Sequence, residues 1–132
     1  MEENKELILI IESDDFFRNL IAEKLKERGY QVSEAKDGTE GLKKIKIEKP
    51  DLVFLNMILN NEKEEGIITL GTIKIDLKKE DPALSSIPVV VLSNLGEPEE
   101  INTALELGAD DYLIKVNSTP ELFVKRIKGI LN

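Results

Sequence analysis

The chain has 132 residues, and its 26 acidic residues outnumber its 18 lysine and arginine residues, which gives a formal net charge of −8. It lacks cysteine and histidine, which excludes disulfides, thiol nucleophiles, histidine-based triads and zinc sites built on these ligands. The only kind of metal ion left to consider is a hard cation, such as Mg²⁺ or Ca²⁺, that is held by oxygen atoms. The acidic balance argues against binding to a nucleic-acid backbone, and no apolar run reaches the roughly 18 residues of a membrane span.

Residues 7–11 are a short apolar run rich in β-branched side chains, which predicts a strand buried on both faces. The acidic residues 12–15 follow at once and predict a turn. Asp14 or Asp15 can cap the next helix, whose apolar positions recur every three or four residues and which ends at Gly29. The chain therefore opens with a strand, an acidic turn and a helix.

The same order of elements repeats in the next segment. Residues 30–35 predict a second strand, and residues 37–40 open a helix that Pro50 closes. The apolar positions of this helix are Leu42, Ile45 and Ile47. Residues 51–56 are apolar until Asn56 and predict a third strand.

The last third of the chain predicts two more strands and two more helices. Residues 87–93 predict a fourth strand, and a helix over residues 99–106 follows, with Pro98 suited to its first turn. Residues 112–115 predict a fifth strand. Residues 118–121 combine a capping box with a proline at the first helical position and therefore open a final helix. Its apolar positions are Leu122, Phe123, Ile127, Ile130 and Leu131.

The segment between the third and fourth strands is ambiguous. Residues 72–78 alternate between apolar and polar side chains as a strand does, whereas Ile67, Leu70, Ile73 and Leu77 fit the stripe of a helix. We favour a helix over residues 67–80, because a parallel sheet needs a crossover at this point.

Five strands that alternate with helices predict a doubly wound α/β fold, which is a (βα)5 flavodoxin-like three-layer sandwich. The expected order of the parallel sheet is 2-1-3-4-5, and residues 1–132 are expected to form one domain. Such sheets bind or react at the carboxyl ends of their strands. The polar residues at those ends are Glu12 to Asp15, Asn56, Ser93, Asn94 and Lys115. Any one of them can simply mark where a strand meets water, so the functional signal is their convergence in one crevice.

The composition of this crevice excludes two ligand classes. The turn after the first strand is Glu-Ser-Asp-Asp, which repels phosphate, so a flavin or nucleotide phosphate loop is not expected there. The chain also lacks the histidine that a cobalamin-binding domain of related topology supplies. The remaining candidate is a site at which acidic side chains face a lysine and a hydroxyl group.

The chain resembles the receiver domains of two-component response regulators over essentially its whole length. The resemblance lies in residues 9–12 with Arg18, in residues 49–57 and in residues 87–93. The most specific stretch is Leu-Gly-Ala-Asp-Asp-Tyr-Leu-Ile-Lys at residues 107–115.

The resemblance implies roles for individual residues. In receivers, two acidic residues after the first strand hold Mg²⁺, an aspartate at the end of the third strand accepts a phosphoryl group from a histidine kinase, and a hydroxyl residue and a lysine contact that group. The metal and the lysine offset the repulsion between the carboxylate nucleophile and the phosphoryl group. By this resemblance Glu12 is the first acidic residue, Ser93 the hydroxyl, Lys115 the lysine and Tyr112 an aromatic residue that changes rotamer.

Two positions depart from the receiver pattern. The phosphoacceptor position is Asn56, an amide that cannot act as the carboxylate nucleophile, and the second acidic position is Ser13. The metal positions by resemblance are therefore Glu12, Ser13, Asn56 and the backbone of Ile58. Glu12 and Lys115 already sum to zero charge, so we expect no cofactor and, at most, weak Mg²⁺ binding.

Two loops that border the pocket also depart from the family. The segment 59–66 is unusual in length and carries Glu62, Glu64 and Glu65 where a proline usually stands. Val116 replaces the proline that commonly follows the lysine, so we expect a trans peptide at this turn.

Three hypotheses about function remain open. The first is a pseudo-receiver that keeps the fold, has no enzymatic activity and acts by protein contact, with Asn56 hydrogen-bonded to Ser93 or Lys115. The second is a phosphorylatable receiver, seen as an Asp-to-Asn variant at position 56, with Asp14 or Asp15 replacing Ser13 after a one-residue slip. The third is an unrelated small-ligand binder on the same flavodoxin-like fold, because fold alone does not decide function.

Nothing follows Asn132, so we expect a stand-alone cytoplasmic domain with no output domain. Its partner is expected to be a protein, such as a histidine kinase or another signalling protein, rather than a nucleic acid or a membrane. The expected assembly is a monomer or a weak homodimer.

Overall fold

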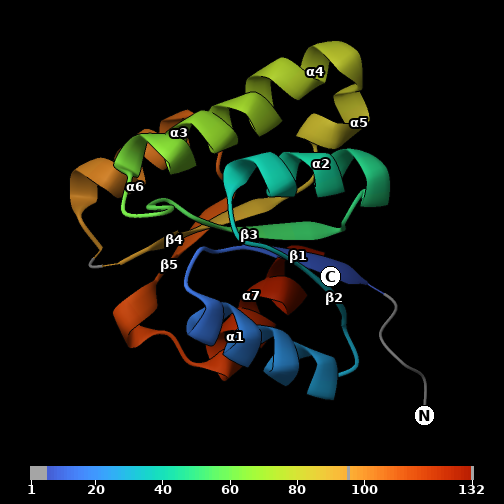
Figure 1. Cartoon of the computed structure of the whole chain (residues 1–132), viewed down its shortest axis with the longest axis vertical. Coiled ribbons are helices and arrows are strands. Elements are labelled where there is room, and N and C mark those ends of the chain that lie inside the picture. The colour runs from blue at the N-terminus through green and yellow to red at the C-terminus, as the bar shows by residue number, and fades with distance from the viewer. Residues whose placement is uncertain (1–5, 95, 132) are drawn as a thin grey trace.

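The computed structural model describes residues 6–94 and 96–131, which form one parallel five-stranded sheet. Its strand order is β2-β1-β3-β4-β5 (Figure 1), as the sequence predicts. The strands are β1 (Leu7–Ile11), β2 (Gln31–Ala35), β3 (Leu52–Asn56), β4 (Val89–Ser93) and β5 (Asp111–Ile114). The doubly wound flavodoxin-like architecture is therefore confirmed.

Helices cover both faces of the sheet, which makes three layers (Figure 1). Helices α1 (Asp15–Glu27) and α7 (Pro120–Leu131) lie on one face. The other face carries α2 (Gly38–Glu48), α3 (Lys63–Gly71), α4 (Leu77–Glu80), α5 (Pro82–Ser85) and α6 (Pro98–Glu106). No helix in residues 6–94 or 96–131 is long and apolar enough to cross a membrane.

Two hydrophobic cores lie on the two sides of the sheet because successive strand residues point to opposite faces. In β1, Ile8 and Ile10 pack in the core beneath α1 and α7, whereas Leu9 and Ile11 pack in the other core. All four side chains are fully buried, which confirms that this strand is covered on both faces.

The ambiguous segment is helical, as predicted. It consists of α3, a π-helical turn η1 (Thr72–Asp76) and α4. Leu70, Ile73 and Leu77 are buried together in the core. The residues that pack are therefore those with helical spacing, and the apolar–polar alternation of residues 72–78 does not indicate a strand. Lys74 lies in the π-helical turn, where its ammonium group donates to the carbonyl oxygens of Ser85 and Ile87 and to Asp110.

Three sequence-based expectations differ from the structure. Ile47 is 76% exposed, because α2 turns this side chain away from the sheet, so its assignment to the apolar face was wrong. Strand β5 ends at Ile114, and Lys115 begins a 3₁₀ turn, η2 (Lys115–Asn117), that the Ser118 hydroxyl closes by donating to the Ile114 carbonyl. The short helix α5, capped by Asp81, was not predicted.

Candidate functional site

The predicted polar residues converge at the carboxyl edge of the sheet. Strand pairing places Asn56 beside Leu92 and Ser93 beside Ile114, while Glu12 follows directly after β1. Glu12, Asn56 and Ser93 are all buried, with exposed fractions of 0%, 3% and 1%. The edge of a largely apolar sheet therefore holds a compact buried polar cluster.

Glu12 is the centre of this cluster. Its carboxylate accepts hydrogen bonds from the Asn56 side-chain nitrogen, at 3.0 Å to Oε1 and 2.9 Å to Oε2, and from the backbone nitrogen of Asp14 at 3.1 Å. Lys115 Nζ lies 2.6 Å from Oε1 and forms an ion pair with it. A buried carboxylate is costly unless it is paired and hydrogen-bonded, and Glu12 is both.

Asn56 has one orientation that satisfies both ends of its amide. Its nitrogen faces the Glu12 carboxylate, and its oxygen accepts from the backbone nitrogen of Ile58 at 3.2 Å. The partners expected from sequence, Ser93 or Lys115, were wrong, because Glu12 lies between Asn56 and the lysine and pairs with both. The side chain at the phosphoacceptor position is thus a donor to a carboxylate.

Lys115 bridges the last strand to the first helix. Its ammonium group lies 4.5 Å from the centre of the Phe17 ring, in addition to its ion pair with Glu12. The side chain is 17% exposed, so both contacts are partly shielded from water. Phe17 belongs to α1 and packs against the core beneath that helix, and no sequence signal marks it as a contact of the site.

Ser93 and Tyr112 make no hydrogen bond with Glu12 among the contacts of the described residues. The Ser93 hydroxyl oxygen accepts from the backbone nitrogen of Gly96 at 3.0 Å and so shapes the turn after β4. Tyr112 is half-buried and packs against the core on the α3 side of the sheet. The peptide between Lys115 and Val116 is trans, as expected.

Ser13 and the unusual loop after β3 belong to one structural feature. Leu59 and Glu62 exchange backbone hydrogen bonds of 3.2 and 2.9 Å, and Asn60 and Asn61 between them have φ angles of 53° and 65°. Two positive φ angles in a two-residue connection are the pattern of a type I′ hairpin, which asparagine tolerates. The backbone nitrogen of Asn60 donates to Ser13 Oγ at 3.0 Å, so this hydrogen bond holds the hairpin to the turn that follows β1.

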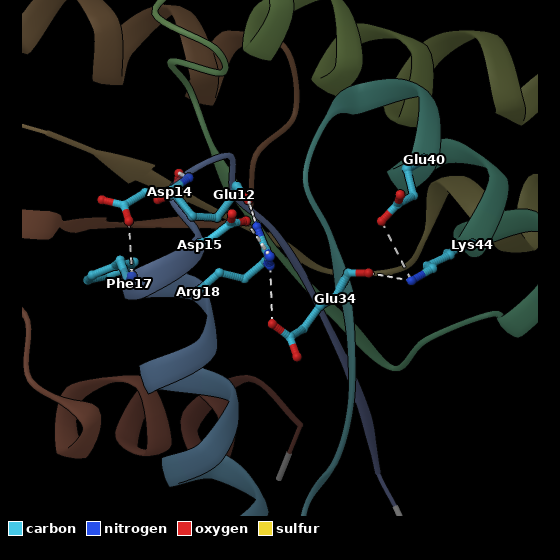
Figure 2. Close-up of polar contacts among 8 residues, drawn as sticks. All are labelled: Glu12, Asp14, Asp15, Phe17, Arg18, Glu34, Glu40 and Lys44. Atoms are coloured by element: carbon cyan, nitrogen blue, oxygen red, sulfur yellow. Dashed lines mark hydrogen bonds and ion pairs between the residues drawn. The ribbon is translucent and has the colours of Figure 1, made fainter.

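Arg18 fixes the turn that carries Glu12 (Figure 2). It donates to the Glu12 carbonyl at 2.7 Å, to Asp15 at 2.7 Å and to Glu34 at 3.1 Å. Burial acts to lower the pKa of Arg18, but the hydrogen bonds with Asp15 and Glu34 outweigh it and hold the pKa above its usual value. Asp14 caps α1 by accepting from the backbone nitrogen of Phe17 at 3.1 Å, so both acidic side chains after Ser13 have partners outside the cluster.

The start of α3 is packed tightly against the residue that follows Asn56. A Cβ atom on Gly66 would lie 2.0 Å from the carbonyl oxygen of Met57, whereas one on Gly71 in the same helix would meet nothing within 4 Å. The glycine therefore permits the close approach of helix and strand end that sets the position of the site loop.

Replacing Gly66 with alanine is expected to destabilise the fold by about 1–3 kcal/mol or more, because either the helix or the Met57 backbone must shift. Urea unfolding monitored by circular dichroism measures the change. Gly71→Ala is the matched control and should be neutral or stabilising, since helix propensity favours alanine. Equal destabilisation by both substitutions would contradict the packing argument.

The oxygen atoms at the receiver metal positions do not fit a divalent cation as they are arranged. Glu12 is paired with Lys115, and the side-chain oxygens of Ser13 and Asn56 each accept a backbone hydrogen bond. Within the described part of the chain, no three acidic side chains are grouped closely enough to hold a metal ion. In this arrangement the negative charge of Glu12 is balanced by the ammonium group of Lys115.

Comparisons with known proteins agree with this fold. The family model for the response regulator receiver domain matches residues 8–128. A relative described as "Probable transcriptional regulator ycf27" from Cyanophora paradoxa is 36% identical over 131 residues, which is 99% of this chain and 50% of that protein. The chain spans about half the length of the curated relatives it matches.

Solved structures show the same likeness. A putative response regulator from Chloroflexus aurantiacus superposes with a TM-score of 0.84 at 26% identity, covering 97% of this chain and 98% of that one. A two-component response regulator from Clostridium difficile gives a TM-score of 0.81 at 29% identity, with 96% of each chain covered.

Proposed function

The chain belongs to the response regulator receiver domain family of two-component signalling, and we propose that it is a pseudo-receiver, which works through protein contact and is not switched by aspartyl phosphorylation. The observation that carries this proposal is the orientation of Asn56, whose amide nitrogen is directed at both oxygens of the Glu12 carboxylate. An amide at this position lacks the carboxylate that forms an acyl phosphate.

The charge of the pocket supports the same conclusion. Glu12 and Lys115 sum to zero, and both Glu12 oxygens already accept hydrogen bonds from Asn56. A divalent cation at this position has to displace an ammonium group 2.6 Å from the carboxylate and gains no second carboxylate in return. We therefore expect Mg²⁺ binding to be weak and the domain to need no cofactor.

The proposed partner is a protein, namely a histidine kinase or another signalling protein. Several curated relatives are named as transcriptional regulators, and about half of each lies outside the part matched by this chain. The single-domain organisation, the cytoplasmic location, the absence of enzymatic activity and the monomeric or weakly dimeric state stay predictions.

A second candidate function is an ordinary phosphorylatable receiver in which Asn56 replaces an aspartate. One observation favours it: the hydroxyl of Ser93 and the ammonium group of Lys115, which the receiver pattern calls for, both belong to residues at the carboxyl edge of the sheet. Ser13 speaks against it, because a hydroxyl group supplies no second carboxylate and its oxygen already accepts from the Asn60 backbone nitrogen.

Acetyl phosphate with Mg²⁺ tests the proposal on the unmodified chain, and it separates the two candidates in the Asn56→Asp variant, which only the second candidate expects to gain a labile phosphoryl group. The pseudo-receiver proposal expects no labile increase in intact mass by one phosphoryl group on the unmodified chain, because the nucleophile is absent. The Ser13→Asp, Asn56→Asp double variant restores both carboxylates and tests whether the rest of the site is competent.

Asn56→Ala is the control that locates any adduct. A labile adduct on the unmodified chain that disappears in Asn56→Ala would overturn the pseudo-receiver proposal. If the double variant stays unmodified, the altered loop at residues 59–62 is the part of the site that blocks the reaction.

A further inference from the structure

A cavity of about 200 Å³ lies beside the degenerate site, between the start of α3 and the start of α6. Buried Met57 and half-buried Ile67 supply its apolar part, and Thr103 lies on its α6 side. Met57 directly follows Asn56, so the cavity begins one residue from the phosphoacceptor position.

The polar part of this cavity is strongly acidic. Glu97, Glu99 and Glu100 line it together with Lys63, which leaves two negative charges without a countercharge in the lining. Glu97 and Glu99 are exposed, and no ion pair of any of the three glutamates is found among the described residues. The cavity is thus complementary to a cation.

Glu100 gives the cavity a specific point of recognition. Its Oε1 atom is buried and has no hydrogen-bond partner among the described residues. A buried carboxylate oxygen without a donor costs free energy, and the half-buried Glu100 side chain recovers it by rotating toward a donor that enters the cavity. The unpaired Glu100 oxygen supports a binding site independently of the net charge of the residues that line the cavity.

The chemistry of the lining selects the kind of cation. A bare divalent ion needs several grouped carboxylates, which the described residues do not provide. An arginine side chain matches both parts of the cavity, because its aliphatic stem packs on apolar side chains and its planar guanidinium donates to carboxylates. A lysine offers a strongly hydrated point charge instead, which loses more on entering an apolar cavity.

We propose that this cavity is a docking site for an arginine side chain of the partner protein, with the guanidinium donating to Glu100 and the stem lying against Met57 and Ile67. This inference names the chemistry of the partner and rests on the protein contact proposed above. An occupant here touches Met57, whose backbone nitrogen donates to Leu92 on the neighbouring strand and whose preceding residue is Asn56. The docking site and the degenerate pocket are therefore adjoining parts of one surface.

Nuclear magnetic resonance titration with a small probe tests the proposal without knowledge of the partner. The probe is N-acetyl-arginine methylamide, and its neutral counterpart of nearly identical shape is N-acetyl-citrulline methylamide. We expect saturable shifts in the backbone amides of Met57, Ile67, Glu100 and Thr103 with the arginine probe and no saturable shifts with the citrulline probe.

Glu100→Gln should weaken binding of the arginine probe by about tenfold, as loss of a charge-assisted contact does. Glu106→Gln is the matched control, because Glu106 is exposed on the same helix outside the cavity and its substitution changes the net charge equally. Glu97→Gln, at an exposed position of the lining, provides a second variant if Glu100→Gln perturbs the fold.

The absence of saturable shifts at the cavity, equal binding of the citrulline probe, or equal losses in Glu100→Gln and Glu106→Gln would each overturn the proposal. These outcomes are independent of the acetyl phosphate experiment. A phosphoryl adduct would refute the pseudo-receiver function while leaving arginine binding at the cavity intact, and a failed titration would refute the docking site alone.

Discussion

The Lys115→Met variant is expected to lose about 3–5 kcal/mol of its free energy of unfolding, because removal of one partner leaves a buried charge uncompensated. The charge in question is Glu12, whose side chain is 1% exposed and whose carboxylate lies 2.6 Å from the ammonium group. Methionine keeps most of the length of the lysine stem, so the loss reports chiefly on the contacts of the ammonium group with Glu12 and with the Phe17 ring. Urea unfolding followed by circular dichroism measures it.

Two further variants make this result interpretable. Lys125→Met removes an exposed lysine from α7 and should change the stability by less than about 0.5 kcal/mol. Adding Glu12→Gln to Lys115→Met should recover part of the loss, because the uncompensated carboxylate is then gone. If the double variant is destabilised by the sum of the two single effects, the ion pair is not the source of the stability.

The second large effect is expected in Asn56→Asp, which replaces a donor to Glu12 with a like charge. The amide nitrogen lies 2.9 and 3.0 Å from the two Glu12 oxygens, so an aspartate oxygen in its place meets a carboxylate at contact distance. Lys115 then faces two negative charges, and the pocket carries a net charge of about −1. We expect destabilisation by about 1–3 kcal/mol in the presence of a chelator.

Mg²⁺ should reverse much of this loss, because two adjacent carboxylates make the oxygen-rich site that the cation prefers. Thermal unfolding with and without millimolar Mg²⁺ measures the effect, and only Asn56→Asp should gain a higher melting temperature. Asn102→Asp, on the exposed face of α6, adds the same charge elsewhere and is the control. An equal rise in the melting temperature of the unmodified chain with Mg²⁺ would show that the existing oxygen atoms suffice to bind the cation.

The alternation of strands and helices and the polar residues at the strand ends were predictable from the sequence because both are local patterns. A strand buried on both faces, such as Leu7–Ile11, appears as a continuous apolar run, and its first polar residue marks the edge where parallel strands end. Glu12, Asn56 and Lys115 each follow such a run. The order of the sheet is not a local property, and its prediction rested on the fold class that the alternation indicates.

The contacts themselves were not predictable, because they depend on long-range geometry. The sequence does not show that the Asn56 amide faces Glu12 rather than Ser93, since three different strand ends decide it. The tether between Ser13 and Asn60 joins residues 47 positions apart. The paired asparagines did carry a local signal, since such pairs favour type I′ turns, and that signal identifies the hairpin but not its partner.

The ion pair between Glu12 and Lys115 in the pocket has a consequence for how long a signal lasts. A phosphorylated receiver stays in its altered state until its acyl phosphate is hydrolysed, so the duration of its signal is set by the lifetime of that bond. In this chain the countercharge of Glu12 is the ammonium group of Lys115, which is covalently part of the fold and is present at all times. Under the proposed function, the signal begins with association and ends with dissociation, so its duration follows the residence time and the concentration of the bound partner.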